Sequence, residues 1–207
     1  MEGEHFSSAL KWYWNQLTDK DKSLDDPFIK DYFRAYEENI LDVETGLPLN
    51  GGCKSRAIAM AGLFKVYTGY LTVGKVYPYA DKAIDSVLKL QFNDGSFGDN
   101  LVKGAMTINW DAIWVLRELD IMLKGSYRHS DIVQAGNRLA DFLMNVHRKP
   151  DGGFSFHPTH CMMEHNSIKT SEKYVESDTQ GTSMSLRCLS YADEWNLKIK
   201  LFSYCVY

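Results

Sequence analysis

KAIDSVLKLQFNDGSF, residues 82–97, recurs 56 residues later as RLADFLMNVHRKPDGGF, residues 138–154. Each copy has a cation, an apolar helical stretch closed by Gln91 or His147, and an Asp-Gly-x-Phe turn. The two turns are 57 residues apart because the second copy has one extra residue. A repeat of this length is typical of stacked supersecondary units that bury their apolar faces against one another. The sequence therefore predicts a helical array.

Apolar residues at helical spacing, separated by turn formers, predict three helix pairs. The repeats span about 27–70, 79–124 and 130–194, and a tail of 195–207 follows. Turns at Gly46, Gly95 and Gly152 join the two helices of each pair, and no segment has the pattern of a strand. We expect one all-α domain over residues 1–207. Its more polar helices would form an outer ring and its more apolar helices an inner ring, as in a partial or open α/α toroid.

Two helix starts carry local signals. Pro27 suits a first helical turn, and we interpret the Asp25-Asp26 pair before it as a cap. Ser130 is expected to cap a helix that runs to about residue 147, with Asp131 in its first turn.

The composition limits which partners the protein could bind and in which cellular compartment it could lie. Hydrophobic residues make up 44% and charged residues 24% of the 207 residues, as in a soluble globular domain. A net charge of -4 gives no electrostatic basis for a nucleic-acid or anionic-membrane partner. No run approaches the roughly 20 apolar residues of a membrane span, and the N-terminus has acids where a signal peptide needs cations. Four scattered cysteines without a CxxC indicate reduced thiols, so we expect a cytoplasmic protein.

The repeat resembles the QW-type repeat of the terpenoid cyclase and protein prenyltransferase superfamily over residues of about 27–194. The second copy fits well at Arg138, Phe142, Leu143, His147, Gly152 and Phe154. The first fits in part, because Ser86-Val87 stand where Phe-Leu is usual. The resemblance implies an α/α toroid in which Gln91, His147 and the Asp-Gly turns tie helix ends together. It does not imply one activity, because polysaccharide lyases and unsaturated-glycan hydrolases also use helical toroids.

The catalytic motifs of that superfamily are incomplete in this chain. The cyclase acid motif, Asp-x-Asp-Asp-Thr-Ala, has its nearest counterpart at Glu176-Ser177-Asp178-Thr179. Ser177 stands where the resemblance would place the proton donor, and a hydroxyl cannot protonate an alkene, which leaves Glu176 as the substitute. The Asp-Asp-x-x-Asp motif of ionising synthases is absent, because Ile29 occupies the place of the third acid after Asp25-Asp26.

Metal ligands are the other requirement of the prenyltransferases, which need Asp, Cys and His to converge on zinc. The long loop 154–178 holds such residues, but at no standard ligand spacing: His157, His160, Cys161, Glu164 and His165. We therefore predict no metal and no cofactor. His157 and His160 are instead candidates for ligand binding, because the loop crosses the rim of the expected cavity.

In a toroid the ligand cavity opens where the inner helices begin, here at 54–56, 107–111 and 176–180. Asn109, Trp110 and Asp111 interrupt an apolar helix, where a buried carboxylate needs a partner. Asp111 could pair with Arg56 or Arg117 to hold helices together, or act as a catalytic carboxylate beside an aromatic platform. The candidate catalytic residues are Asp111, Asp178 and Glu176, and the candidate ligand-binding residues are Arg56, Asn109, Trp110, His157 and His160.

The leading hypothesis is a ligand-cavity protein of the toroid group, with a cyclase-, transferase- or lyase-like activity on an isoprenoid or a saccharide. One alternative is a non-catalytic helical-repeat module that binds a protein; another is a fragment of a polysaccharide lyase-like toroid. A closed pocket holding Trp110, Asp111 and Asp178 would favour the enzyme, and an open crescent would favour the module.

The C-terminal end is the expected site of assembly, because three repeats do not close a ring. We expect a homodimer or a partner complex that covers the apolar residues of this end, namely Met184, Leu186, Leu189, Tyr191, Leu197, Ile199, Leu201, Phe202, Tyr204 and Val206.

Overall fold

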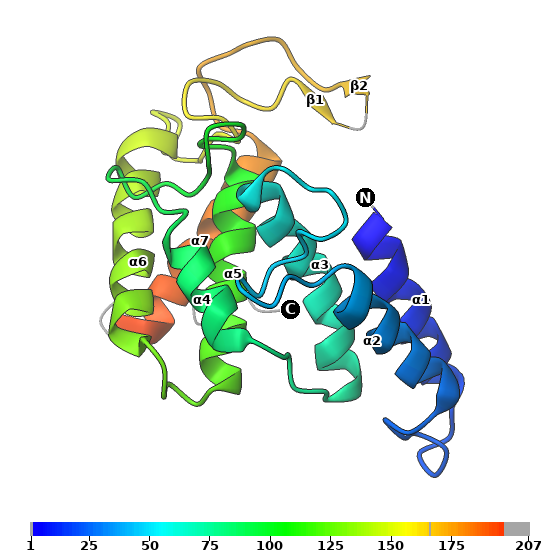
Figure 1. Ribbon diagram of the computed structural model, residues 1–207. Helices are drawn as coiled ribbons and strands as arrows, with labels where there is room; N and C mark the ends of the chain where they lie inside the picture. Colours follow the sequence, from blue (N-terminus) through cyan, green and yellow to red (C-terminus); the bar gives the residue numbers. More distant parts are fainter. Residues whose placement is uncertain (1, 166, 197–207) are drawn as a thin grey trace. The chain divides into compact units, whose positions relative to one another are not determined.

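The computed structural model describes residues 2–165 and 167–196 (Figure 1). These residues are mostly helical, which confirms the all-α prediction. The helices are α1 (Glu2–Gln16), α2 (Pro27–Asn39), α3 (Arg56–Val73), α4 (Ala80–Leu88), α5 (Met106–Met122), α6 (His129–Phe142) and α7 (Thr179–Asn196). A π-helical turn, η1 (Leu143–His147), continues α6, and β1 (Glu164–His165) pairs antiparallel with β2 (Ile168–Lys169). The short hairpin lies in the long loop before α7 and was not predicted.

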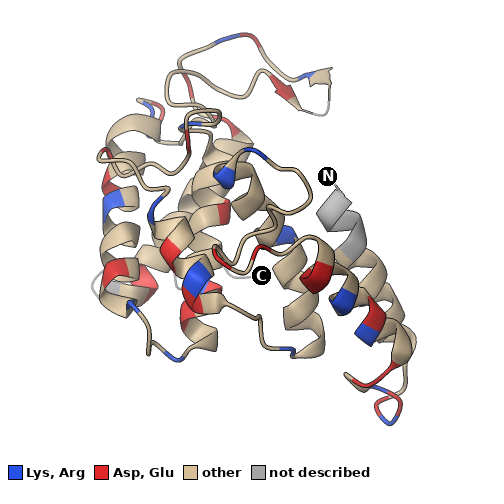
Figure 2. Cartoon of the chain, viewed as in Figure 1, with Lys and Arg blue, Asp and Glu red and all other residues tan. Residues whose placement is uncertain are grey.

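The chain divides into two compact units, one up to Val87 and one from Leu88. Among the described helices, none is both long and apolar enough to cross a membrane. Figure 2 shows acidic and basic residues interspersed over the described helices.

The first unit packs α1 against α3 around a core rich in tyrosine. The buried tyrosine hydroxyls have polar partners: Tyr36 and Tyr77 lie 3.2 Å apart, and Tyr77 donates to the Gly46 carbonyl at 2.8 Å. Tyr70 donates to Glu37 at 2.8 Å. Burial raises the pKa of all three tyrosines, so their hydroxyls stay protonated and can donate.

Two predicted helix starts had different outcomes. Asp26 caps α2, because its carboxylate accepts from the Phe28 and Ile29 amides, and Pro27 occupies the first turn as predicted. The cap assigned to Ser130 was wrong, since α6 begins at His129 after Arg128 in the left-handed conformation (φ +51°). The Arg128 side chain forms an ion pair with Asp131 at 2.7 Å.

The second unit contains α5, α6 and α7, with α7 packed on both other helices. Helices α5 and α7 run parallel, because contacting residues keep an almost constant sequence offset. Ser185 donates to the Met106 sulfur at 3.3 Å near the start of both helices, and Arg117 pairs with Glu194 at 2.9 Å near their ends. In a stack of helix pairs, equivalent helices of successive pairs run parallel, as α5 and α7 do.

The three predicted turns share one backbone feature. An isolated antiparallel bridge closes each of them: Asp42 to Leu47, Gln91 to Phe97 and Arg148 to Phe154. The first turn resembles the other two only in part, because its bridge joins residues five positions apart instead of six and Leu47 directly follows Gly46. The glycine in each turn has a positive φ, of +66° at Gly46, +93° at Gly95 and +92° at Gly152.

Two of these glycines also allow close packing against a neighbouring helix, α4 at Gly46 and α6 at Gly95. A Cβ atom at Gly46 would lie 2.6 Å from the Ala83 nitrogen, and one at Gly95 would lie 2.2 Å from the Arg138 carbonyl oxygen. Gln91 reinforces the second contact by donating to the Gly95 and Ala135 carbonyls at 3.0 and 2.8 Å and accepting from Arg138 at 2.9 Å. The predicted structural role of Gln91 is thus confirmed.

The third turn lacks this contact, since a Cβ at Gly152 would meet nothing within 4 Å. The exposed side chains of α6 are polar. In α7, Met184, Leu186, Leu189 and Tyr191 are partly exposed. The other residues of the predicted assembly surface, at 197–207, lie outside the described part of the chain.

Candidate functional site

The starts of α5 and α7 lie at the same end of the second unit because the two helices are parallel (Figure 1). The loop that precedes α7 joins them. Its Phe156 carbonyl accepts from the Met106 amide at 3.2 Å, and its Asp178 amide donates to the Phe154 carbonyl at 3.0 Å. The structure therefore places residues 109–111 and 176–178 around one end of the second unit. That these helices form the inner ring of a toroid stays a prediction.

Asp178 anchors the loop to α7. Its Oδ2 accepts from the Phe156 and Met162 amides at 2.7 and 3.0 Å, and its Oδ1 accepts from the Gly181 amide at 2.7 Å. The carboxylate thus caps the helix and holds two distant points of the loop at once. Both oxygens are occupied, which favours a structural role; the catalytic role of Asp178 stays a prediction.

A groove of about 360 Å³ lies beside the start of α7. Glu176, Asp178 and Thr179 line one part of it, and Cys161 and His165 contribute from the loop. Glu176 is exposed there. Trp110 and Asp111 are not among the residues that line this groove, so it is not the closed pocket that would favour an enzyme.

Asn109 performs a structural task at the start of α5. It is fully buried, and its side-chain oxygen accepts from the Phe97 amide at 2.7 Å. Thr182 does the same in the next pair, with its hydroxyl 2.9 Å from the Phe154 amide. Both residues stand fourth in their helix, and each holds the aromatic residue of an Asp-Gly-x-Phe turn. The sequence analysis missed Thr182, although the shared fourth position was a usable signal.

Asp111 is buried, with 2% of its surface exposed, and lies beside Cys188. Burial, reinforced by the Asp111 charge, raises the pKa of the Cys188 thiol. The predicted pairing of Asp111 with Arg117 was wrong, because Arg117 binds Glu118 and Glu194 instead. Arg56 is the exposed first residue of α3 in the first unit, and its pairing with Asp111 stays a prediction.

His157 and His160 stack on each other within the loop, with ring centroids 4.6 Å apart and planes 19° from parallel. Burial, and then the neighbouring His160, lower the pKa of His157. His147 lies fully buried at the end of η1, where Nδ1 is 2.7 Å from the Ser155 carbonyl oxygen and burial lowers its pKa. These rings are therefore mainly neutral at pH 7. Within the described residues, no group of three or more His, Cys, Asp or Glu side chains could hold a metal.

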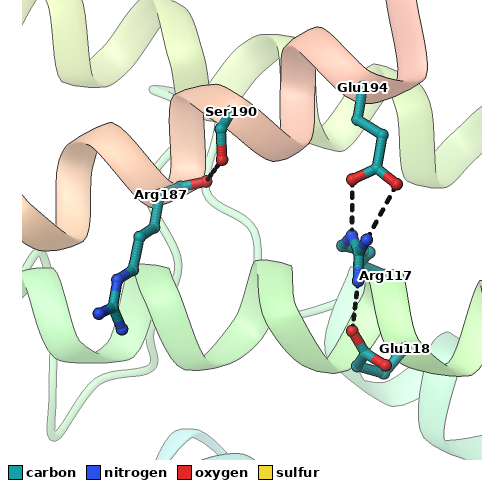
Figure 3. Close-up of polar contacts among 5 residues, drawn as sticks. All are labelled: Arg117, Glu118, Arg187, Ser190 and Glu194. Carbon is teal, nitrogen blue, oxygen red and sulfur yellow. Dashed lines mark hydrogen bonds and ion pairs between the residues drawn. The ribbon is translucent and has the colours of Figure 1, made fainter. Parts of the chain in front are cut away.

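Aromatic and arginine side chains lie next to one another along α5 and α7. The Arg187 guanidinium lies 5.3 Å from the centre of the Trp110 ring, and that of Arg117 lies 5.0 Å from the centre of the Tyr191 ring. Figure 3 shows Arg117 reaching from α5 to Glu194 on α7. We call this surface the α5–α7 face; it comprises Trp110, Trp114, Arg117, Arg187, Tyr191 and Glu194. Trp110 was a predicted site residue, but its arginine partner on α7 was not.

No protein-family model matches this chain, and searches of the curated proteins and of the solved structures returned no match.

Proposed function

We propose that this chain is a non-catalytic helical-repeat module that binds a protein partner through the α5–α7 face. The observation that carries the proposal is a contrast between acids and aromatics. Both oxygens of Asp178 are engaged by backbone amides, and Asp111 is buried. Trp110 and Tyr191, by comparison, are partly exposed beside arginines. The carboxylates that catalysis would need are buried or engaged by amides, whereas the aromatic residues that recognition would use are partly exposed.

The composition of the α5–α7 face supports protein binding. Tryptophan, tyrosine and arginine are the residues that most often dominate the energy of protein interfaces, because they bury large areas at low conformational cost. Trp110 and Trp114 are one helical turn apart, so they point to the same side of α5. Two packed helices hold these groups rigidly, and this lowers the entropy lost on binding.

The proposal also includes a fold related to the α/α toroids and a location in a reducing compartment of the cell. Three glycine turns that are each closed by an antiparallel bridge, together with the parallel α5 and α7, support a place near the α/α toroids of the cyclase and prenyltransferase group, without their acid or metal motif. Free thiols at Cys53, Cys161 and Cys188 support a reducing compartment such as the cytoplasm.

Selection of random peptides displayed on phage tests the binding function. Peptides enriched on the intact chain are titrated against wild type, against a Trp114→Ala/Tyr191→Ala double variant, and against Trp12→Ala as a control with an exposed tryptophan in the first unit. We expect binding at least about tenfold weaker to the double variant only, as for loss of interface anchors. The single variants replace the double variant if its circular dichroism shows lost helix.

Two results would contradict the proposal. One is the absence of enriched peptides, or equal binding to the double variant. The other is turnover of allylic diphosphates or acidic oligosaccharides, followed by mass spectrometry, that stops in Asp178→Asn.

A further inference from the structure

Three histidines lie together where the long loop before α7 begins. The His147 ring is fully buried, and His157 is near enough for the charges of the two rings to interact. The His157 ring in turn stacks on the His160 ring, with the two centroids 4.6 Å apart. Three of the six histidines of the chain thus gather in one place. Histidine is the side chain whose charge changes most readily between about pH 5 and 8.

The same place anchors the first part of the loop. Ser155 donates from its amide to the His147 carbonyl at 2.9 Å, and its own carbonyl oxygen lies 2.7 Å from His147 Nδ1. Lys149 is buried and donates from Nζ to the Val146 and Pro158 carbonyls at 3.0 and 2.8 Å. A proton gained by this cluster therefore acts where the loop is attached to the end of η1.

The neutral form of the His147 ring suits its surroundings, and the charged form does not. Nδ1 faces a carbonyl oxygen, so it carries the proton of the neutral ring and donates it. A second proton must bind Nε2, which is buried and has no hydrogen-bond partner among the described residues. A buried N–H without an acceptor is costly, and so is a buried charge without a partner. Burial accordingly lowers the pKa of His147.

The charged groups that face the three rings do not offset such protonation. Lys149 faces His147 and His160, Lys173 faces His160, and Asp178 faces His147 and His157. The two oxygens of Asp178 already accept from three backbone amides. Asp151, which faces Lys149, accepts from two more. Full protonation would therefore add three positive charges beside two lysines. Burial first, and then neighbouring positive groups, lower the pKa of His157 and of His160.

We propose that His147, His157 and His160 form an acid-sensitive latch, in which neutral rings hold residues 155–160 against η1 and protonated rings release them. Because the pKa values of the held rings lie below the ordinary value of about 6.5, the latch is complete above that pH and weakens as the pH falls below it. The loop joins the starts of α5 and α7, so acid would change this end of the second unit and leave the helices in place. The latch does not depend on the proposed binding function.

Amide hydrogen exchange, followed by NMR on the intact chain, tests the latch. The protection factor of an amide is its intrinsic exchange rate divided by its observed rate at the same pH, so it reports opening alone. We expect the protection of the Ser155 and His157 amides to fall at least about tenfold between about pH 7 and pH 5.5, because each histidine that stays neutral in the held loop adds up to about tenfold per pH unit below 6.5. Amides in the middle of α5 should change less than about twofold.

Histidine variants assign the effect to the cluster. In a His147→Gln/His157→Gln/His160→Gln variant the protection of the Ser155 amide should stay constant to within about threefold over the same pH range, because no group of the latch then titrates. His165→Gln removes an exposed histidine of the same loop and should behave as wild type. If the triple variant does not fold, the His157→Gln/His160→Gln variant takes its place, and its protection should fall less than that of wild type.

Three results would overturn the latch. The first is protection of the loop amides that does not change with pH in wild type. The second is a histidine variant of the cluster whose protection falls as far as that of wild type. The third is an equal fall in the α5 amides, which would show that acid unfolds the whole unit and does not release the loop.

Discussion

Replacing Gly95 with alanine should destabilise the chain more than the same change at Gly152. Both glycines stand in an Asp-Gly-x-Phe turn, with nearly equal φ of +93° and +92°. They differ in surroundings: a Cβ at position 95 would lie 2.2 Å from the Arg138 carbonyl oxygen, and one at position 152 would meet nothing within 4 Å. Gly152→Ala is therefore a matched control for the backbone strain.

The expected magnitudes follow from this difference. An L-residue at positive φ costs about 1–2 kcal/mol, partly offset by about 0.4–1 kcal/mol from the lower entropy of the unfolded chain. Gly152→Ala should thus lower the free energy of unfolding by about 1 kcal/mol. Gly95→Ala adds a steric overlap worth about 1–3 kcal/mol and disturbs the Gln91 hydrogen bonds to the Gly95 and Ala135 carbonyls. We expect a total of about 2–4 kcal/mol.

Urea unfolding, followed by circular dichroism and tryptophan fluorescence, measures both variants. With a slope of about 2 kcal/mol/M, the two midpoints should differ by about 1 M, with Gly95→Ala the lower. Unchanged slopes would show that the difference is one of stability. Equal midpoints, or a lower midpoint for Gly152→Ala, would refute the close approach of the turn to α6.

Three further substitutions test single contacts. Asn109→Ala should cost about 1–3 kcal/mol in urea unfolding, because the buried Phe97 amide loses its acceptor; unchanged stability would argue against that bond. His147→Gln should reduce the acid sensitivity of folding: burial lowers the pKa of His147, so the stability present above about pH 6.5 is lost as the pH falls toward the lower folded pKa. If the stability of the variant fell with pH as steeply as that of wild type, His147 would not be the buried group that causes the acid sensitivity. Asp178→Asn should speed proteolysis of the loop before α7, whereas Glu176→Gln, exposed and without a capping bond, should not; equal rates would contradict the anchor.

The glycine turns and the α2 cap could be predicted because their chemistry is local. Gly95 and Gly152 follow an aspartate in short segments rich in turn formers, and Asp26 directly precedes a proline. The start of α6 depends instead on Arg128, whose left-handed conformation is an uncommon choice for its residue type. Sequence preference therefore pointed to Ser130.

In the candidate site, too, only the local features could be predicted from the sequence. Asn109 and Asp178 stood out as polar residues at helix starts, but their hydrogen bonds join them to turns and loops that only the folded chain brings near. Arg187 looked like an ordinary surface arginine in α7. Its relation to Trp110 depends on the parallel pairing of α5 and α7, and no local pattern reports that pairing.

The indole N–H resonances of the five tryptophans test the binding site most directly. In a ¹H–¹⁵N spectrum each gives one signal, which single Trp→Phe variants assign, and a peptide enriched by the phage selection is added unlabelled. The account predicts that the signals of Trp110 and Trp114 shift and that those of Trp12 and Trp14 do not. Shifts confined to Trp12 and Trp14, or no shift at a saturating concentration, would contradict recognition through the α5–α7 face.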